Sequence, residues 1–165
     1  MLTGAAFAPG NVAQAFSLDG IDDYVYLGIP VAQGVPALTY EAWINPDDVT
    51  GNHGLVVGRL GAHQMFLADN GHLYAYRWST GGTGSASSWD TSAVVPVGTW
   101  THVAATFDAT NIKAYINGVE VGSTSYAWPL IDSGDPMLIG TDVCWQPAKM
   151  GHIGTREIKG EGSLR

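Results

Sequence analysis

The sequence contains very little cysteine and little positive charge. Cys144 is the only cysteine among 165 residues, so no disulfide can form within the chain. Seven Lys and Arg residues stand singly against 15 Asp and Glu residues, and the formal net charge is −8. Nucleic acids and anionic membrane surfaces are bound by clustered cations, which this sequence lacks. We therefore expect neither as a partner.

Long apolar runs are also missing. No uninterrupted apolar stretch approaches the length that crosses a membrane, so we expect no membrane insertion. The first 18 residues are uncharged, but they contain Gly4, Pro9, Gly10 and Asn11 and have no basic segment. They do not make a convincing signal peptide. Any export must therefore be encoded outside this chain or use another route.

Charged helix-forming residues are scarce, with four glutamates and three lysines against 22 glycines. Short strands joined by tight turns need Gly, Asn and Asp, whereas helices favour Glu, Lys, Ala and Leu. Hydrophobic residues make up 45% of the chain and supply a core. A chain of this length fits one domain, so we predict a single β-rich domain over residues 1–165.

Alternation of apolar and polar residues with period two recurs along the chain, which is typical of half-buried strands. Asn117-Gly118 is the strongest two-residue hairpin signal, and residues 79–88 read as a polar, glycine-rich loop. The alternation predicts strands at residues 13–18, 24–27, 38–44, 55–59, 64–68, 72–78, 100–107, 112–116, 119–121, 137–140 and 151–158. So many short strands predict an all-β, two-sheet antiparallel β-sandwich.

Four stretches resemble, in order and spacing, the laminin G-like jelly-roll family of the concanavalin A-like lectin and glucanase superfamily. They are AFSLDGIDDYVYLG (15–28), LTYEAWINP (38–46), GTWTHVAATFDATNIKAYINGVEVGS (98–123) and PMLIGTD (136–142). The resemblance covers residues 13–158 and implies a concanavalin A-like jelly roll with an extracellular or cell-surface location. It implies no single function, because this fold hosts lectins, adhesion modules, structural modules and hydrolases.

The sequence departs from the family at its end. Such domains usually close with a strand resembling G-x-I-D-E-V-R-I-Y, whereas residues 151–159 read GHIGTREIK. Gly154 and Thr155 stand where the acidic pair is expected. We therefore expect an altered closing strand and a mobile tail over residues 160–165.

Catalytic pairs of carboxylates are absent from the sequence pattern. Glycoside hydrolases of this superfamily place acidic residues two apart on one strand, so that one acts as the acid and the other as nucleophile or base. Glu41, Glu120, Glu157 and Glu161 are the only glutamates, and none has such a partner. We predict no catalytic residue, and a degraded hydrolase is the remaining enzymatic alternative.

Asp19, Asp22 and Asp23 crowd a turn. Carboxylates and backbone carbonyls are the hard oxygen ligands that calcium prefers, and calcium is the one candidate cofactor. The resemblance implies a calcium site here, completed by an acidic residue of the last strand, where Gly154 stands. The alternative is a turn at Asp19-Gly20 with solvated carboxylates.

Glu41 and Trp43 share one face of a predicted strand, and His102 lies on the corresponding face of another. Trp43, Trp100 and His102 recur in the family, which indicates packing on the concave side of the sandwich. The functional alternative is a shallow groove floored by Glu41, Trp43, His102 and Tyr115.

Four tryptophans lie outside the framework that the family shares, namely Trp78, Trp89, Trp128 and Trp145. Tyr74, Tyr76 and Trp78 occupy one face of a strand that leads into the glycine-rich loop. An aromatic row with period two can stack on sugar rings while Asp, Asn or His bind the hydroxyls. The same rings could instead cover the sandwich edges or pack against a partner chain. The candidate ligand-binding residues are Tyr74, Tyr76, Trp78, Trp89, Trp128 and Trp145.

Together these features favour a non-catalytic, lectin-like module that binds carbohydrate, with calcium assisting. The alternative is a protein-interaction or assembly module of a cell-surface or phage structural protein. The sequence does not indicate an oligomeric state.

Overall fold

The computed structural model describes residues 1–20, 22–28, 36–49, 54–59, 62–68, 70–77, 87–125, 134–140 and 158–164, to which all structural statements below refer. Their regular secondary structure is entirely β. Among them, no helix has the length and hydrophobicity that crossing a membrane requires.

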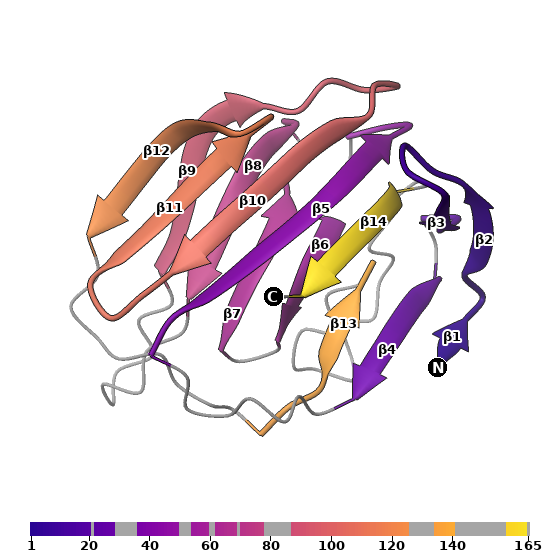
Figure 1. Cartoon of the computed structure of the whole chain (residues 1–165), viewed down its shortest axis with the longest axis horizontal. Helices are drawn as coiled ribbons and strands as arrows, with labels where there is room; N and C mark the ends of the chain where they lie inside the picture. Colours follow the sequence, from indigo (N-terminus) through magenta and orange to yellow (C-terminus); the bar gives the residue numbers. More distant parts are fainter. Residues whose placement is uncertain are drawn as a thin grey trace.

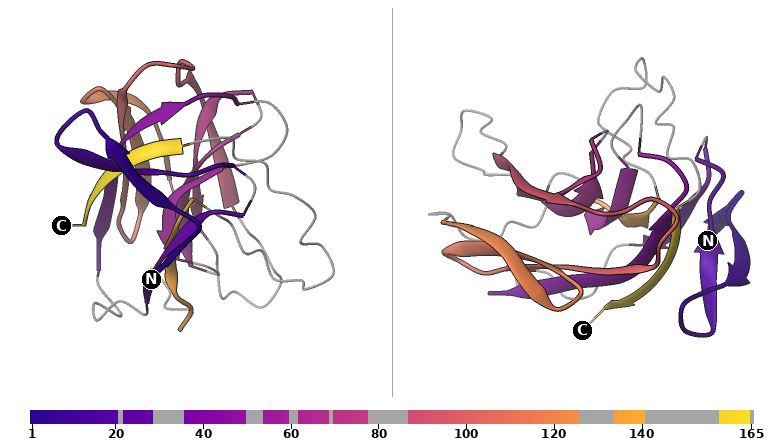
Figure 2. Two further views of the ribbon diagram at one scale, coloured as in Figure 1. Left: turned by 90° about the vertical axis from the view of Figure 1, so that its right-hand side faces the viewer. Right: turned by 90° about the horizontal axis from the view of Figure 1, so that it is seen from above.

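The strands form two seven-stranded sheets that stack face to face (Figures 1 and 2). Sheet A contains, in spatial order, β1 (Leu2–Thr3), β4 (Tyr24–Gly28), β13 (Met137–Ile139), β6 (Gly54–Arg59), β7 (His63–Leu67), β8 (His72–Arg77) and β9 (Ser87–Val94). Sheet B contains β12 (Val119–Ser125), β11 (Asn111–Ile116), β10 (Thr101–Phe107), β5 (Leu38–Pro46), β14 (Ile158–Leu164), β3 (Gln14–Ser17) and β2 (Ala6–Pro9). Neighbouring strands pair antiparallel, which confirms the predicted β-sandwich.

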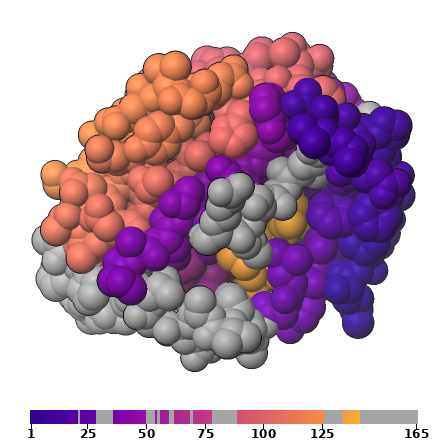
Figure 3. Space-filling view, in the orientation of Figure 1, coloured from indigo at the N-terminus to yellow at the C-terminus, as the bar shows by residue number. Residues whose placement is uncertain are grey.

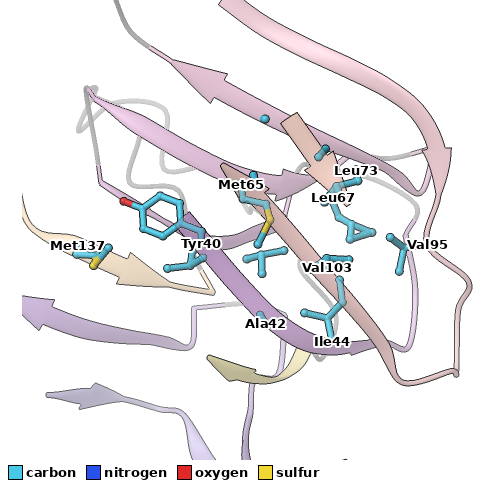
Figure 4. Packing of buried hydrophobic residues seen from close by; sticks show 14 of the residues in the cluster. Tyr40, Ala42, Ile44, Met65, Leu67, Leu73, Val95, Val103 and Met137 are labelled. Carbon is cyan, nitrogen blue, oxygen red and sulfur yellow. The ribbon is translucent and has the colours of Figure 1, made fainter. Parts of the chain in front are cut away.

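The core lies between the sheets, where period-two alternation turns one side of each strand inward. In β5, Tyr40, Ala42 and Ile44 are buried, while the residues between them are only half-buried on the outer face. Figure 4 shows these side chains together with Val103 of β10 and Met65 of β7 in the interior between the sheets. Burying a large aliphatic side chain stabilises the fold by about 1.5–3 kcal/mol, so this alternation is what holds the two sheets together.

The interior also holds one polar pair. The Tyr40 hydroxyl lies 2.6 Å from Nδ1 of His63. Burial raises the pKa of the Tyr40 hydroxyl, so the group stays protonated and can donate to the imidazole. The hydrogen bond satisfies both groups and allows Tyr40 to face the core.

Two arginines are turned into the sandwich rather than toward solvent. Arg77 is fully buried and donates from Nη1 to the backbone carbonyl of Asp108 at 2.6 Å. Arg59 is 2% exposed and donates from Nε to the carbonyl of Asp135 at 2.9 Å. The loops at this end are therefore tied to β6 and β8 by charge-assisted hydrogen bonds.

The C-terminal strand β14 shows that one prediction was wrong. β14 pairs with β5 from Ile158, opposite Pro46, to Leu164, opposite Tyr40, and Gly160 also pairs with Phe16 of β3. Residues 160–164 are thus part of the sheet rather than a mobile tail. The physical reason is that β3 and β5 would otherwise leave facing rows of N–H and C=O groups unpaired in the middle of sheet B. The atypical stretch at Gly154 and Thr155 falls outside the described residues.

Three other strands were not predicted. β1 and β2 are short edge strands near the N-terminus, and β9 begins at Ser87 within the predicted loop. Ser and Asp are depleted in strands, so the β9 sequence SSWDTSAV carries a weak signal. Pairing with β8 supplies the hydrogen-bond ladder that the local sequence does not predict.

Candidate functional site

An aromatic row lies on the outer face of sheet A. In β8, Leu73 and Ala75 are fully buried, whereas Tyr74 and Tyr76 are half-buried on the opposite face. Tyr74 stands directly opposite Phe66 of β7, and their rings stack with centroids 5.1 Å apart and planes 29° apart. The structure thus places Tyr74 and Tyr76 on one face, as the alternation predicts, and adds Phe66, which the sequence did not single out.

The polar end of this row is built around Asp90 of β9. Tyr74 donates its hydroxyl hydrogen to Asp90 Oδ2 at 2.9 Å, and Nδ1 of His72 lies 3.0 and 3.1 Å from the two carboxylate oxygens. The backbone N–H of Ser92 donates to Oδ1 at 2.7 Å. Burial alone would raise the pKa of Asp90, but the hydrogen bonds from Ser92, His72 and Tyr74 together lower it below its ordinary value. Asp90 is therefore held as a carboxylate, and we call His72, Tyr74 and Asp90 the Asp90 cluster.

A bulge in β9 begins directly after Asp90. Residues 90–94 of β9 span the same length as residues 72–74 of β8. Ser92 adopts a φ of 58°, which costs a residue other than glycine on the order of 1 kcal/mol. The Asp90 carboxylate offsets this cost by accepting the Ser92 N–H, and Thr91 Oγ1 donates to the carbonyl of Leu73 at 2.7 Å. Bulges of this kind re-aim side chains and are frequent beside functional sites.

The Asp90 cluster also determines which nitrogen of His72 carries hydrogen. Nδ1 of His72 faces the Asp90 carboxylate and also lies 3.0 Å from Nδ2 of Asn70. The Oδ1 atom of Asn70 accepts a hydrogen bond from the backbone N–H of His72. A hydrogen bond to a charged group contributes about 1.5–3 kcal/mol, against about 0.5–1.5 kcal/mol for a neutral pair. Nδ1 therefore carries the hydrogen and donates it to the Asp90 carboxylate, rather than accepting a hydrogen bond from the Asn70 amide. Nε2 then holds a lone pair, and it has no hydrogen-bond partner among the residues that the structure describes.

Trp89 faces the other way from Asp90. It stands opposite the buried Ala75 and packs against the hydrophobic core. A Cβ atom added at Gly122 of β12 would lie 2.8 Å from Cζ2 of the indole. Trp89 thus fills the space between sheets A and B at their β9 and β12 edges, which is the packing alternative stated above. The remaining tryptophan candidates Trp78, Trp128 and Trp145 lie outside the described residues.

The four candidates for a shallow groove lie on the outer face of sheet B, the face seen in Figure 3. Trp43 and His102 are cross-strand partners with ring centroids 5.3 Å apart, and His102 Nε2 lies 3.8 Å from Glu41 Oε2. Ala104 stands between Glu41 on one side and Tyr115 on the other. All four are half-buried, so the structure places Glu41, Trp43, His102 and Tyr115 near one another on one face.

β14 adds an acidic position to this part of sheet B. Glu161 pairs with Trp43, and Ser163 pairs with Glu41, so Glu161 is diagonal to Glu41 in register. No local sequence signal could have predicted this, because it depends on the pairing of two strands far apart in the chain.

The three aspartates of the candidate calcium site lie together after β3. The carboxylate oxygens that Asp19, Asp22 and Asp23 can offer are all within 4.8 Å of one another. Two ligands that each lie about 2.4 Å from one calcium ion are at most about 4.8 Å apart, so the oxygens fit around one such ion. A Cβ atom at Gly4, where φ is 72°, would overlap Asp23 Oδ1, so a larger residue there would have to displace this carboxylate. The turn hydrogen bonds, from Asp19 N to Asp23 Oδ2 and from Asp22 N to Asp19 Oδ1, also satisfy part of this cluster.

A family model described as the concanavalin A-like lectin/glucanases superfamily matches residues 19–154. The chain belongs to this superfamily. The match includes the three aspartates, both candidate surfaces and most of the strands. No curated protein sequence matches the chain.

Several solved structures share the fold of this chain. Domain 4 of AbnA, an extracellular GH43 arabinanase from Geobacillus stearothermophilus solved with arabinotriose, has a TM-score of 0.64 and 24% identity, covering 98% of this chain and 77% of that one. A Bacteroides ovatus protein described as carbohydrate-binding has a TM-score of 0.63 and 22% identity, covering 86% of this chain and 40% of that one. The endo-β-1,4-glucuronan lyase of the fungus Trichoderma reesei has a TM-score of 0.67 and 13% identity, covering 97% and 85%. At these identities the likeness shows the concanavalin A-like fold, which binding domains and enzymes share.

Proposed function

We propose that this concanavalin A-like domain binds carbohydrate without cleaving it, through the outer face of β7, β8 and β9. The observation that supports this is the aromatic row of Phe66, Tyr74 and Tyr76 beside the Asp90 cluster. Aromatic faces stack on the C–H faces of sugar rings, and fixed polar groups beside them bind hydroxyls. Trp78, which follows β8 in the sequence, lies outside the described residues and remains a candidate from the sequence alone.

The structural neighbours support the same class of ligand. One of them is a domain solved with arabinotriose, and another is described as carbohydrate-binding. We propose an extracellular location for this chain by the same likeness, since the arabinanase is extracellular.

The proposal that the domain is not catalytic is based on the surroundings of Glu41. A glycosidase needs two carboxyl groups about 5–10 Å apart across the scissile bond. The residues directly opposite Glu41 are Ala104 and Ser163, and Nε2 of His102 lies 3.8 Å from its carboxylate. Glu161, diagonal to Glu41, keeps the hydrolase alternative testable: glycan cleavage that is abolished by Glu41→Gln would establish it.

Two tyrosines on opposite sheets allow the binding face to be identified. Calorimetric titration with neutral oligosaccharides should show binding by the wild-type protein. Tyr76→Ala on sheet A should weaken binding at least tenfold, about 1.4 kcal/mol, whereas Tyr115→Ala on sheet B should leave it unchanged. Trp78→Ala should act like Tyr76→Ala. Loss of binding in Tyr115→Ala alone would assign the ligand to the sheet B face instead.

One observation favours the alternative of an interaction module. Phe7 of edge strand β2 is 59% exposed and Val12 in the following turn is 61% exposed, and exposed apolar groups are frequent interface anchors. Flat titrations with every glycan, together with an oligomer in solution scattering that Phe7→Ser dissociates, would establish this alternative.

We also propose that calcium binds Asp19, Asp22 and Asp23. The support is the spacing of their oxygens and the chemistry of carboxylates, since hard oxygen ligands suit this ion. An ion there would fix the turn between β3 and β4, at the end of the sandwich where sheet B passes into sheet A.

A further inference from the structure

The Asp90 cluster presents hydrogen-bond acceptors to a ligand. Tyr74 gives its hydroxyl hydrogen to Asp90, so toward any other group it acts as an acceptor. His72 gives its Nδ1 hydrogen to the same carboxylate, which leaves the lone pair of Nε2 for a ligand. A sugar hydroxyl can donate to such atoms, whereas a carboxylate or sulfate has no hydrogen to donate.

The charge of this face acts in the same direction. Asp90 is negative, and among the described outward residues of β7, β8 and β9 there is no Lys or Arg. The arginines of the adjoining strands, Arg59 and Arg77, are buried and bind backbone carbonyls of loops. An acidic ligand would therefore approach a negative carboxylate without a described cation to receive it.

We propose that the His72–Asp90 pair makes this surface select neutral, hydroxyl-rich glycans over glycans that carry carboxylate or sulfate groups. The inference rests on the proposed function and names the class of ligand that the same surface binds. His72 Nε2 accepts a hydrogen bond from a sugar hydroxyl, and Asp90 is a positioning residue that keeps Nε2 free of hydrogen. Neither residue belongs to the set that the sequence predicted.

The tautomer of His72 can be measured without any ligand. Nitrogen-15 NMR at about pH 8, where an ordinary histidine is neutral, should show hydrogen on Nδ1 and none on Nε2. Asp90→Asn replaces the acceptor with an amide that can donate to Nδ1, so the hydrogen should move to Nε2. Asp108→Asn is a matched control, since it removes an equal charge from the turn between β10 and β11 and should leave the tautomer unchanged. Hydrogen on Nε2 in the wild-type protein would overturn the inference.

Selectivity is tested with glycans that differ at one carbon. Neutral β-1,4-glucan oligosaccharides and β-1,4-glucuronan oligosaccharides of equal length share a backbone and differ by a hydroxymethyl or carboxylate group at C6. A second set pairs other neutral glycans with their C6-oxidised or sulfated forms. We expect the neutral member of each pair that binds to do so at least tenfold more tightly. In the Asp90→Asn variant, the ratio of the affinity for the neutral glycan to that for its acidic partner should fall toward one. The Asp108→Asn variant should keep the wild-type ratio.

The possible failures can be told apart. Acidic glycans that bind as tightly as their neutral partners would overturn the selectivity and leave carbohydrate binding intact. Absence of binding to every member of both sets would overturn the proposed function, and the selectivity with it. His72→Gln provides a second variant, because its amide can donate to a carboxylate or sulfate as well as accept from a hydroxyl. It should improve the binding of acidic glycans and so lower the ratio of neutral to acidic affinity.

Discussion

At the position of Gly122, the sandwich leaves no room for a side chain, because the Trp89 indole occupies that space. We predict that Gly122→Ala destabilises the protein by about 1–3 kcal/mol through overpacking. Urea denaturation followed by tryptophan fluorescence measures this. The exposed neighbour Ser123→Ala should have little effect, and Trp89→Leu should reduce the cost of Gly122→Ala. Equal stability of Gly122→Ala and wild type would contradict the described packing.

Asp90 should make stability depend on pH. Its folded pKa lies below the ordinary value of 3.8, so its hydrogen bonds stabilise the fold above that pH and lose effect as the pH falls through the folded pKa. The side chain is 35% exposed, so we expect a contribution below about 1 kcal/mol. The difference in urea midpoint between wild type and Asp90→Asn should be present at pH 7 and shrink below about pH 4. A difference that stays constant with pH would exclude this role.

Residues that depend on alternation within one strand could be predicted, and those that depend on register could not. Tyr74 and Tyr76 share a face because they are two apart on β8. Asp90 meets Tyr74 because the register of β9 on β8 places the two residues opposite each other, and Ser92, whose N–H binds the carboxylate, is neither the Gly nor the Asn that would signal positive φ. The polar half of the site was therefore hidden from the sequence.

At the scale of the strands, we predict that β14 is required to complete sheet B. Deleting residues 158–165 should expose the facing hydrogen-bonding groups of β3 and β5 and abolish cooperative unfolding. Differential scanning calorimetry gives the readout, and deletion of Arg165 alone is the control. A synthetic peptide of residues 158–164 added in trans should restore part of the transition by strand addition. An unchanged melting temperature after the deletion would show that β14 is dispensable.

The strands that were predicted best are those whose local pattern agrees with their place in the sheet. β5, β10 and β11 alternate cleanly and match the predicted ranges within two residues. In the Asn117-Gly118 turn between β11 and β12, both residues adopt positive φ, as a tight hairpin requires. β9 and β14 are rich in Ser or Gly and are strands because of their neighbours, which no local pattern reports.

Calcium binding would stabilise the whole molecule by mass action. At a calcium concentration 100 times the Kd, the expected gain is about 2.7 kcal/mol, seen as a higher melting temperature that EDTA reverses. Asp23→Asn should remove most of the gain, and Asp108→Asn should retain it. A melting temperature that does not respond to calcium would argue for a turn with solvated carboxylates.

The architecture of the whole molecule could be predicted because its motifs keep their order and spacing along the chain, and the family match confirms it. The ligand could not be predicted in the same way. Structures with this fold include binding domains and a lyase, so the fold alone does not determine the ligand. Under our proposal the side chains of His72 and Asp90 do so.

The position of β14 has a consequence for biosynthesis. The strand that lies between β3 and β5 is the last of the fourteen to be translated, although its partners emerge from the ribosome among the first. Until residue 164 has left the exit tunnel, two open strand edges face each other across a gap and can capture a segment from another nascent chain. We therefore expect the unfinished chain to aggregate more readily than the complete domain during this interval.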